Sequence, residues 1–311
     1  MPAAVRSALA LVMCLLAGLG SAVGQTAIRA ADDLGQLLLQ SSNWTYQLQG
    51  VRPAELAVTR FDVIVMDAFF GGGRREIERL RTLPFGRRRL LLSYLSIGEA
   101  EVYRYYWQRC CSGGKRPPWI TTENQRWRGN WRVHFWDPEW KSIIFQEDDS
   151  YLKRIIAAGF DGVYLDRIDV HSEVSAPGIA PRAEMLRFVR ELSATAKAMR
   201  PGFLVIAQNA EELADDASYL AAIDGIAKED LLYGVAGEGK RNEPGMIKES
   251  TALLMRAHAA GKHIMVVEYL SEPATIERAR TEILELGFVP YFAPRSLGKL
   301  QVESLELDDS H

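Results

Sequence analysis

The sequence predicts a single-domain (β/α)8 barrel, also called a TIM barrel, of the α/β class. Short apolar runs rich in β-branched or aromatic residues alternate with longer amphipathic stretches, which is typical of strand and helix units forming a parallel sheet. Several runs are apolar on both faces, as expected for strands buried between a barrel interior and a helical shell. The length of 311 residues, with 48% hydrophobic and 25% charged residues, is compatible with one such domain.

Eight strand candidates can be counted, and their number favours a closed barrel. They cover residues 45–49, 62–67, 89–96, 162–166, 203–208, 223–229, 263–269 and 288–292. An open doubly wound sheet is the main competing architecture. No glycine-rich phosphate loop follows the first candidate, so the sequence offers no support for a nucleotide-binding version of that sheet.

The helices between these strands have readable ends. Asp137 can cap a helix whose first turn contains Pro138, and its apolar stripe runs to about Gly159. A second helix, 181–199, is closed by the pair Pro201-Gly202. Further helices are expected at about 74–81, 211–220, 245–260 and 273–286.

The first residues have the order of a signal peptide. Arg6 precedes an apolar run over residues 8–19, and small residues around Ala22 and Gly24 suit cleavage before Gln25. We therefore expect a signal peptide over residues 1–24, a mature domain over 25–311, and a secreted or periplasmic location. Only the neighbours Cys110 and Cys111 then remain, and two separate thiols are favoured over a strained vicinal disulfide.

Charge and hydropathy restrict the class of partner. The formal net charge is -3 and the pI is near 6, so there is no electrostatic reason to expect nucleic acid. No later segment approaches a membrane span, so stable membrane insertion is not expected after signal cleavage. We expect a monomer.

One connection is unusually long and aromatic. About forty residues separate the third strand from the helix at Pro138, and long loops in compact domains are usually functional or disordered. The aromatic residues of this connection are Tyr103, Tyr105, Tyr106, Trp107, Trp119, Trp127, Trp131 and Trp136. They could form a wall that stacks a carbohydrate, with Trp136 as a binding residue, or a satellite hydrophobic cluster over the barrel mouth. Residues 133–136 could add a short strand.

Polar residues gather at the carboxyl ends of the strand candidates, where barrels of this type have their active face. Most of them are acids, and converging carboxylates repel one another, so a purely structural role would not require such a ring. The candidate binding residues are Asp67, Tyr94, Glu99, Asp169, Gln208, Asn209, Glu268 and Tyr269. Asp169 is explained nearly as well by an Asx turn.

Asp166 and Glu229 are the candidate catalytic pair. Strand alternation puts Tyr164 and Asp166 on one face, and it puts Gly225, Ala227 and Glu229 on another shared face, with Lys228 pointing away. The alternatives are a turn-capping role for Asp166 and a surface ion pair for Glu229.

Two carboxylates across a barrel mouth are the minimal machinery of a glycosidase. A separation of about 5 to 5.5 Å implies retention, and about 6.5 to 9.5 Å implies inversion. We expect retention, with Asp166 as the nucleophile and Glu229 as the acid/base.

Several segments resemble glycoside hydrolase family 114, which contains endo-α-1,4-polygalactosaminidases. They are Gly159-Phe160-Asp161-Gly162-Val163-Tyr164-Leu165-Asp166, Gln208-Asn209-Ala210-Glu211-Glu212-Leu213 and the stretch from Ile223 to Tyr233. Residues 95–101 and 135–140 look like two more segments of this family. Asn209-Ala210 stands where the family pattern has Asn-Gly.

The resemblance implies a barrel, export, no metal or organic cofactor, and a polysaccharide substrate of the galactosamine-polymer class. It also implies Asp166 and Glu229 as the catalytic pair. Two other readings stay open from the residues alone. One is a non-catalytic carbohydrate-binding barrel involved in exopolysaccharide handling. The other, a metal-dependent hydrolase, has weaker support because no His accompanies the carboxylates at ligand spacing.

Overall fold

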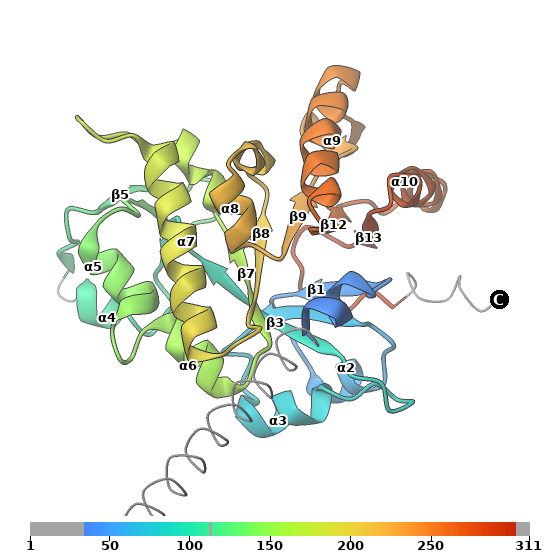
Figure 1. Cartoon of the computed structure of the whole chain (residues 1–311), viewed down its shortest axis with the longest axis horizontal. Coiled ribbons are helices and arrows are strands. Elements are labelled where there is room, and N and C mark those ends of the chain that lie inside the picture. The colour runs from blue at the N-terminus through green and yellow to red at the C-terminus, as the bar shows by residue number, and fades with distance from the viewer. Residues whose placement is uncertain (1–33, 112–113, 303–311) are drawn as a thin grey trace, which may run out of the picture.

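The computed structural model describes residues 34–111 and 114–302 and confirms the (β/α)8 barrel (Figure 1). Eight parallel strands form one sheet in the order β1-β2-β3-β7-β8-β9-β12-β13. Their bounds are β1 Trp44–Gln47, β2 Val63–Asp67, β3 Leu90–Ser96, β7 Gly162–Asp166, β8 Leu204–Gln208, β9 Gly225–Glu229, β12 His263–Glu268 and β13 Val289–Phe292. Each lies within, or one residue from, the corresponding run expected from the sequence. The expected signal peptide, residues 1–24, lies outside the described residues.

The first and last strands close the barrel mainly through side chains. The indole Nε1 of Trp44 donates to the carbonyl oxygen of Val289 at 3.0 Å, and the Thr45 hydroxyl donates to the Tyr291 hydroxyl at 3.1 Å. Just beyond the strands, the amide of Leu48 donates to the carbonyl oxygen of Leu297 at 3.0 Å. The sheet is therefore nearly closed, with a seam between β1 and β13.

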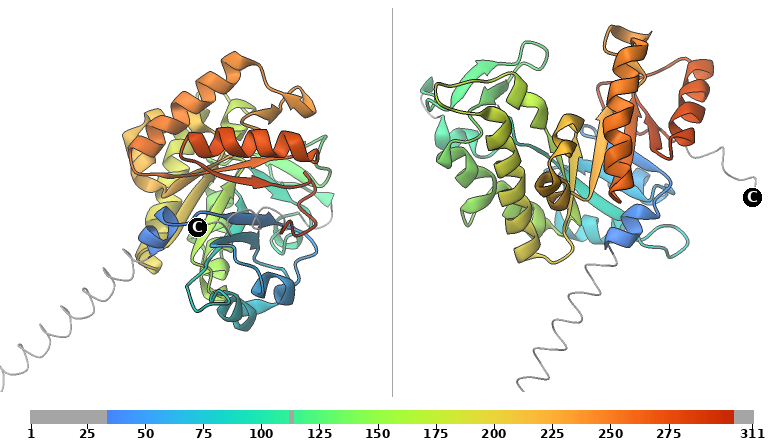
Figure 2. Two further views of the ribbon diagram at one scale, coloured as in Figure 1. Left: turned by 90° about the vertical axis from the view of Figure 1, so that its right-hand side faces the viewer. Right: turned by 45° about the horizontal axis from the view of Figure 1, so that its top comes forward.

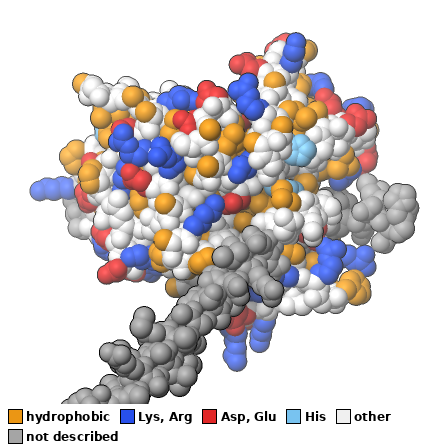
Figure 3. Space-filling view, in the orientation of Figure 1, with side chains coloured by type: hydrophobic (Ala, Val, Ile, Leu, Met, Phe, Trp, Pro, Cys, Tyr) orange, Lys and Arg blue, Asp and Glu red, His pale blue; other side chains and the backbone are white. Residues whose placement is uncertain are grey.

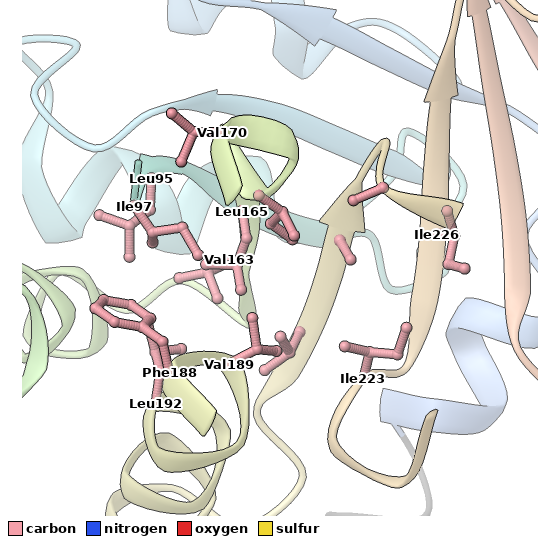
Figure 4. Close-up of a cluster of buried hydrophobic side chains, with 14 of the residues drawn as sticks. Leu95, Ile97, Val163, Leu165, Val170, Phe188, Val189, Leu192, Ile223 and Ile226 are labelled. Atoms are coloured by element: carbon pink, nitrogen blue, oxygen red, sulfur yellow. The ribbon is translucent and has the colours of Figure 1, made fainter. Parts of the chain in front are cut away.

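Side chains on the strands divide into two buried clusters, one inside the sheet and one beneath the helices. The inner cluster includes Trp44, Tyr46, Val63, Val65, Leu92, Tyr164, Ile206, Ala227, Met265, Val267 and Tyr291. Figure 4 shows Val163 and Leu165 on the other side of β7, near Phe188, Val189 and Leu192 of the helix Pro181–Met199. The strand alternation assumed for Asp166 is therefore present.

The helices lie around the outside of the strands (Figure 1), and Figure 2 shows α9 and α10 beside each other next to the last two strands. Their bounds are α2 Pro53–Ala57, α3 Gly73–Leu80, α4 Trp107–Cys110, α5 Pro138–Lys141, α6 Tyr151–Ala158, α7 Pro181–Met199, α8 Ala217–Ala222, α9 Pro244–Ala259 and α10 Pro273–Glu285. The helix expected to begin at Asp137 is divided into α5, a π-helical turn over Ser142–Gln146, and α6. Asp137 caps it as expected, accepting a hydrogen bond from the amide of Glu139 at 2.9 Å.

The long connection after β3 contains a three-stranded antiparallel sheet in the order β4-β6-β5. Its strands are Glu99–Glu101, Asn130–Val133 and Ile120–Glu123, so the extra strand lies slightly earlier than residues 133–136. Tyr106 and Trp119 are buried beneath it and contact Trp140 of α5. Most aromatic residues of this connection thus belong to a hydrophobic cluster. A second hairpin, β10 Tyr233–Gly234 and β11 Gly237–Arg241, follows β9.

The surface in Figure 3 shows acidic, basic and apolar side chains interspersed over the visible face. Within residues 34–111 and 114–302, no helix is both long enough and apolar enough to cross a membrane. Cys110 and Cys111 are free thiols.

Gly98 brings β3 against the chain that leaves β7. A Cβ atom at position 98 would lie 2.2 Å from the carbonyl oxygen of Arg167 and 2.4 Å from Cγ1 of Val170. The amide of Ile97 donates to the carbonyl oxygen of Asp166 at 3.0 Å, so the close approach holds the end of β7. Only glycine fits this position without a backbone shift.

We expect the substitution Gly98→Ala to lower the free energy of unfolding by about 1 to 3 kcal/mol, because the added methyl group overlaps the carbonyl oxygen of Arg167 and the side chain of Val170. Chemical denaturation measures this change. Gly245→Ala is the matched control, since a Cβ atom there meets no atom within 4 Å. Equal stability of the two variants would contradict the close approach.

Candidate active site

A cavity of about 970 Å³ opens at the carboxyl ends of the barrel strands. Six inward-facing side chains from neighbouring strand ends line it: Asp67, Tyr94, Asp166, Gln208, Glu229 and Tyr269. The connection after β3 and the segments after β9 and β13 supply the outer wall. The cavity is at the upper end of the range for small-molecule sites.

Asp166, at the end of β7, is held by neutral hydrogen-bond donors. The hydroxyl of Tyr94 donates to its Oδ2 at 2.7 Å, and the amide of Arg167 donates to its Oδ1 at 2.7 Å. Both carboxylate oxygens are therefore fixed from the strand side, and the carboxylate is turned into the cavity rather than capping the following turn.

Glu229, at the end of β9, is held in a similar way. The amide Nδ2 of Asn209 donates to its Oε2 at 3.1 Å, and the Tyr269 hydroxyl donates to its Oε1. The backbone amide of Glu229 in turn donates to Oδ1 of Asn209 at 3.0 Å. Asn209 thus binds both ends of Glu229 and fixes the direction of its side chain.

The two carboxylates interact through their charges. They lie on strands separated only by β8, so two strand spacings put their Cα atoms roughly 10 Å apart, and both side chains point inward. Burial, followed by repulsion from Glu229, raises the pKa of Asp166 to about 7. This repulsion disfavours the state in which both carboxyl groups are ionised.

The remaining charges around the cavity are mostly compensated. Ten carboxylates and seven Lys or Arg side chains line it. Arg104 forms ion pairs with Asp67 and Glu101, and Arg167 forms ion pairs with Glu99, Asp169 and Glu173. Lys228 pairs with Glu211, and Arg295 pairs with Asp230. Glu212 contacts His171. In the described part of the chain, no such pair reaches Asp166 or Glu229.

Two arginines, the buried Arg104 and the partly buried Arg167, provide most of this compensation. The Arg104 side chain is only 4% exposed, and it contacts Asp67 at 2.6 Å and Glu101 at 2.6 Å. Arg167 contacts Glu99 at 3.0 Å and Glu173 at 2.7 Å. Sequence reasoning missed both residues, although Arg167 directly follows Asp166.

Seven of the expected binding residues line the cavity: Asp67, Tyr94, Glu99, Asp169, Gln208, Asn209 and Tyr269. Glu268 and Trp136 lie elsewhere. Glu268 points out of the barrel, where it accepts hydrogen bonds from the amides of Leu232 at 2.7 Å and Tyr233 at 3.2 Å, and burial raises its pKa to about 8. Trp136 stacks on His134 with ring centroids 4.8 Å apart and packs against the outer core.

Residues with a left-handed backbone conformation also gather around the cavity. Every described non-glycine residue with a positive φ lines it: Arg167, Asn209, Ala210, Asp230 and Leu297. Four of these directly follow β7, β8 or β9. Such conformations cost about 1 to 3 kcal/mol each and cluster at functional sites. Asn and Asp accept them most readily, which is a weak signal that the sequence carries at Asn209 and Asp230.

Comparison with known proteins identifies relatives along nearly the whole chain. The sequence model of glycoside-hydrolase family GH114 matches residues 26–306. An uncharacterised protein of Deinococcus radiodurans is 36% identical over 263 residues, which cover 83% of this chain and 82% of the relative. One of Methanocaldococcus jannaschii is 34% identical over 307 residues, covering 90% and 85%.

A solved structure supports the same architecture. A variant of the glycoside hydrolase domain of PelA from Pseudomonas aeruginosa has a TM-score of 0.64 and 17% identity with this chain. The match covers 84% of this chain and 97% of that domain. This likeness confirms the fold.

Replacing Arg104 by Met should lower the free energy of unfolding by about 3 kcal/mol or more, because Asp67 and Glu101 would then be left beside each other without a cation. Thermal and chemical denaturation measure the loss. Arg74→Met is the control, since Arg74 pairs with Glu78 on the exposed surface and should cost less than about 1 kcal/mol. A loss no larger than the control's would show that the buried pairs contribute little.

The raised pKa of Asp166 predicts a pH-dependent stability difference for Asp166→Asn. The folded wild type binds a proton more tightly than the unfolded chain, so its free energy of unfolding falls as pH rises from about 4 through about 7. Asparagine does not ionise, so the Tm of the variant relative to wild type should be higher at pH 8 than at pH 5.

Differential scanning fluorimetry across this pH range measures the trend. Asp148→Asn is the control, because Asp148 is exposed and its pKa is lowered by Lys153. A constant Tm difference for Asp166→Asn would contradict the raised pKa of Asp166.

Proposed function

The chain belongs to glycoside-hydrolase family GH114, and from this premise we propose that it hydrolyses an amino-sugar polysaccharide of the α-1,4-galactosaminoglycan type. One observation carries the proposal. Asp166 and Glu229 face one cavity, interact electrostatically, and are the lining carboxylates without a basic or His partner in the described chain. A glycosidase requires two carboxyl groups at one site, one to protonate the leaving oxygen and one to attack the sugar or activate water.

The proposed reaction proceeds with retention in two steps. In the reactive form Asp166 is ionised and Glu229 carries the proton, although Asp166 is the carboxyl group whose pKa is raised in the free enzyme; a cationic sugar bound beside Asp166 would lower that pKa. Asp166 attacks the anomeric carbon while Glu229 gives its proton to the departing glycosidic oxygen, so that a glycosyl-enzyme ester forms and the C–O bond breaks. Glu229 then removes a proton from water, whose oxygen attacks the same carbon and releases Asp166 as carboxylate. The acid/base is thereby protonated again for the next turnover.

The neighbouring side chains fit these roles. Hydrogen bonds from Tyr94 and from the amide of Arg167 orient Asp166 and stabilise its anionic form. Asn209 and Tyr269 orient the carboxylate of Glu229, which lines the cavity. Replacing water with these fixed donors favours attack by a correctly placed carboxylate.

The charge of the cavity supports a cationic sugar. Its ten carboxylates exceed its seven Lys and Arg side chains, and the two carboxylates without a basic or His partner lie at the strand ends. Coulomb attraction therefore favours the ammonium group of a deacetylated amino sugar over a neutral hydroxyl. Export through the N-terminal 24 residues would bring the enzyme to an extracellular polymer. Fractionation and N-terminal sequencing of the mature chain test this.

Asp166→Asn and Glu229→Gln should each lower kcat/KM on partially deacetylated galactosamine polymer by about 10² to 10⁴-fold, because each removes a group that changes its bonding in the transition state. Product sizing by chromatography measures the rate. Asp148→Asn and Glu277→Gln are matched controls outside the cavity and should retain wild-type activity. Binding without hydrolysis by the wild type would instead support a non-catalytic carbohydrate-binding barrel.

Azide rescue assigns the two roles. With 2-amino-2-deoxy-α-galactosyl fluoride, Glu229→Ala should accumulate the α-glycosyl azide, because azide attacks the glycosyl-enzyme in place of activated water. Asp166→Ala should give the β-glycosyl azide, because azide replaces the missing nucleophile. The reverse pattern would exchange the roles, and an initial β-anomeric product from wild type, seen by ¹H NMR, would overturn retention.

A further inference from the structure

Exposed aromatic side chains concentrate at the barrel mouth. Among the large hydrophobic side chains that are exposed in residues 34–111 and 114–302, four are aromatic: Phe69, Phe85, Tyr103 and Trp127. Tyr103 and Trp127 line the cavity that holds the catalytic pair. Phe69 and Tyr103 line a second cavity of about 670 Å³. Phe85 lines neither, and it lies before β3, at the opposite rim of the barrel.

The two cavities adjoin. They share Leu48, Asp67, Tyr103 and Arg104 as lining residues, so Tyr103 stands at their boundary. The second cavity contains neither Asp166 nor Glu229 and extends over the segments after β1 and β2. Together they form a continuous depression that leads away from the catalytic pair.

Phe69 and Tyr103 are held in place by one buried cation. The guanidinium carbon of Arg104 lies 4.9 Å from the ring centroid of Tyr103 and 5.8 Å from that of Phe69. The hydroxyl of Tyr103 donates to Glu101, which is itself paired with Arg104. Each ring therefore has a fixed inner face against Arg104 and an exposed part on the side of the cavities.

Trp127 lies in a turn between β5 and β6 that is stabilised by hydrogen bonds to the side chain of Asn124. The side-chain oxygen of Asn124 accepts from the amides of Arg126 at 3.0 Å and Trp127 at 3.2 Å. The side-chain nitrogen of Asn124 donates to Glu99 at 2.9 Å. Trp127 is nevertheless 49% exposed, so a turn with many internal hydrogen bonds holds a large apolar ring in water.

We propose that Phe69, Tyr103 and Trp127 form an aromatic track that binds sugar units of the polysaccharide outside the cleavage point. This rests on the proposed function and extends it to the length of polymer recognised. The apolar C–H faces of pyranose rings pack on aromatic rings and keep their hydroxyl groups in water. Rigid rings lose little conformational entropy on binding, which suits them to repeated weak contacts along a chain. An ammonium group on the sugar adds cation–π attraction.

The track is tested by calorimetric titration in the inactive Asp166→Asn background, with partially N-acetylated α-1,4-galactosamine oligosaccharides as probes. Trp127→Ala, and the double change Phe69→Ala with Tyr103→Ala, should each weaken octasaccharide binding by about five- to tenfold. The Kd of a disaccharide, which is too short to reach from the catalytic pair along the track, should stay within about twofold. Trp127→Phe retains a ring and should recover most of the affinity.

Phe85→Ala is the matched control, being an exposed aromatic outside both cavities, and should bind like the parent. Circular dichroism verifies that every variant is folded. Equal octasaccharide affinity of Trp127→Ala and the parent would overturn the track while leaving the proposed hydrolase intact. Absence of binding to either oligosaccharide by the parent, with no hydrolysis by the wild type, would count against the proposed substrate and the track with it.

Discussion

Side chains alternate between the two faces of every barrel strand, and the chemistry at the mouth depends on this alternation. On β7 it sends Val163 and Leu165 to the helical shell and leaves Tyr164 and Asp166 inside. The same alternation on β9 puts Ala227 in the interior and Glu229 above it. A shift of one residue in either strand would bury hydrophobic side chains on the wrong face. The packing of the whole barrel therefore fixes the direction of the two carboxylates.

Asp166 and Glu229 differ from the other carboxylates of the cavity in how their charge is compensated. A ring of acids at one end of a barrel is electrostatically unfavourable unless cations lie among them. Arg104, which is buried, and Arg167, which is partly buried, supply this compensation, and each pairs with at least two carboxylates. Asp166 and Glu229 instead receive hydrogen bonds from neutral tyrosine, asparagine and backbone groups. Neutral donors orient a carboxylate without adding a countercharge to it, which suits the nucleophile and acid/base roles proposed for this pair.

Much of this arrangement could be predicted from the sequence, because hydrophobic periodicity locates strands and the strand-end rule locates the active face. The eight strands agree with this prediction, and seven of the nine residues predicted to bind substrate line the cavity. The prediction that Glu268 lines the cavity is wrong. Tyr269 faces the cavity, so the preceding residue, Glu268, faces outward, and backbone amides after β9 donate hydrogen bonds to it. The positions of Trp136, Arg104 and Arg167 could not be predicted from the sequence for another reason. They belong to, or pair with, the connection after β3, and its internal sheet depends on long-range pairing that local pattern does not encode.

The left-handed residues at the strand ends connect fold and site. Arg167, Asn209, Ala210 and Asp230 each turn the chain sharply just after β7, β8 or β9, so the strand ends stay at the rim and the next segment leaves the mouth open. Position 210 has a φ of 52°, a conformation that costs glycine less free energy than alanine. This explains why the family pattern has glycine there. Such strain persists only where surrounding contacts outweigh it. Here those contacts include the paired hydrogen bonds between Asn209 and Glu229 and the ion pairs of Arg167 and Asp230, so the interactions that orient the proposed catalytic groups also hold the strained backbone in place.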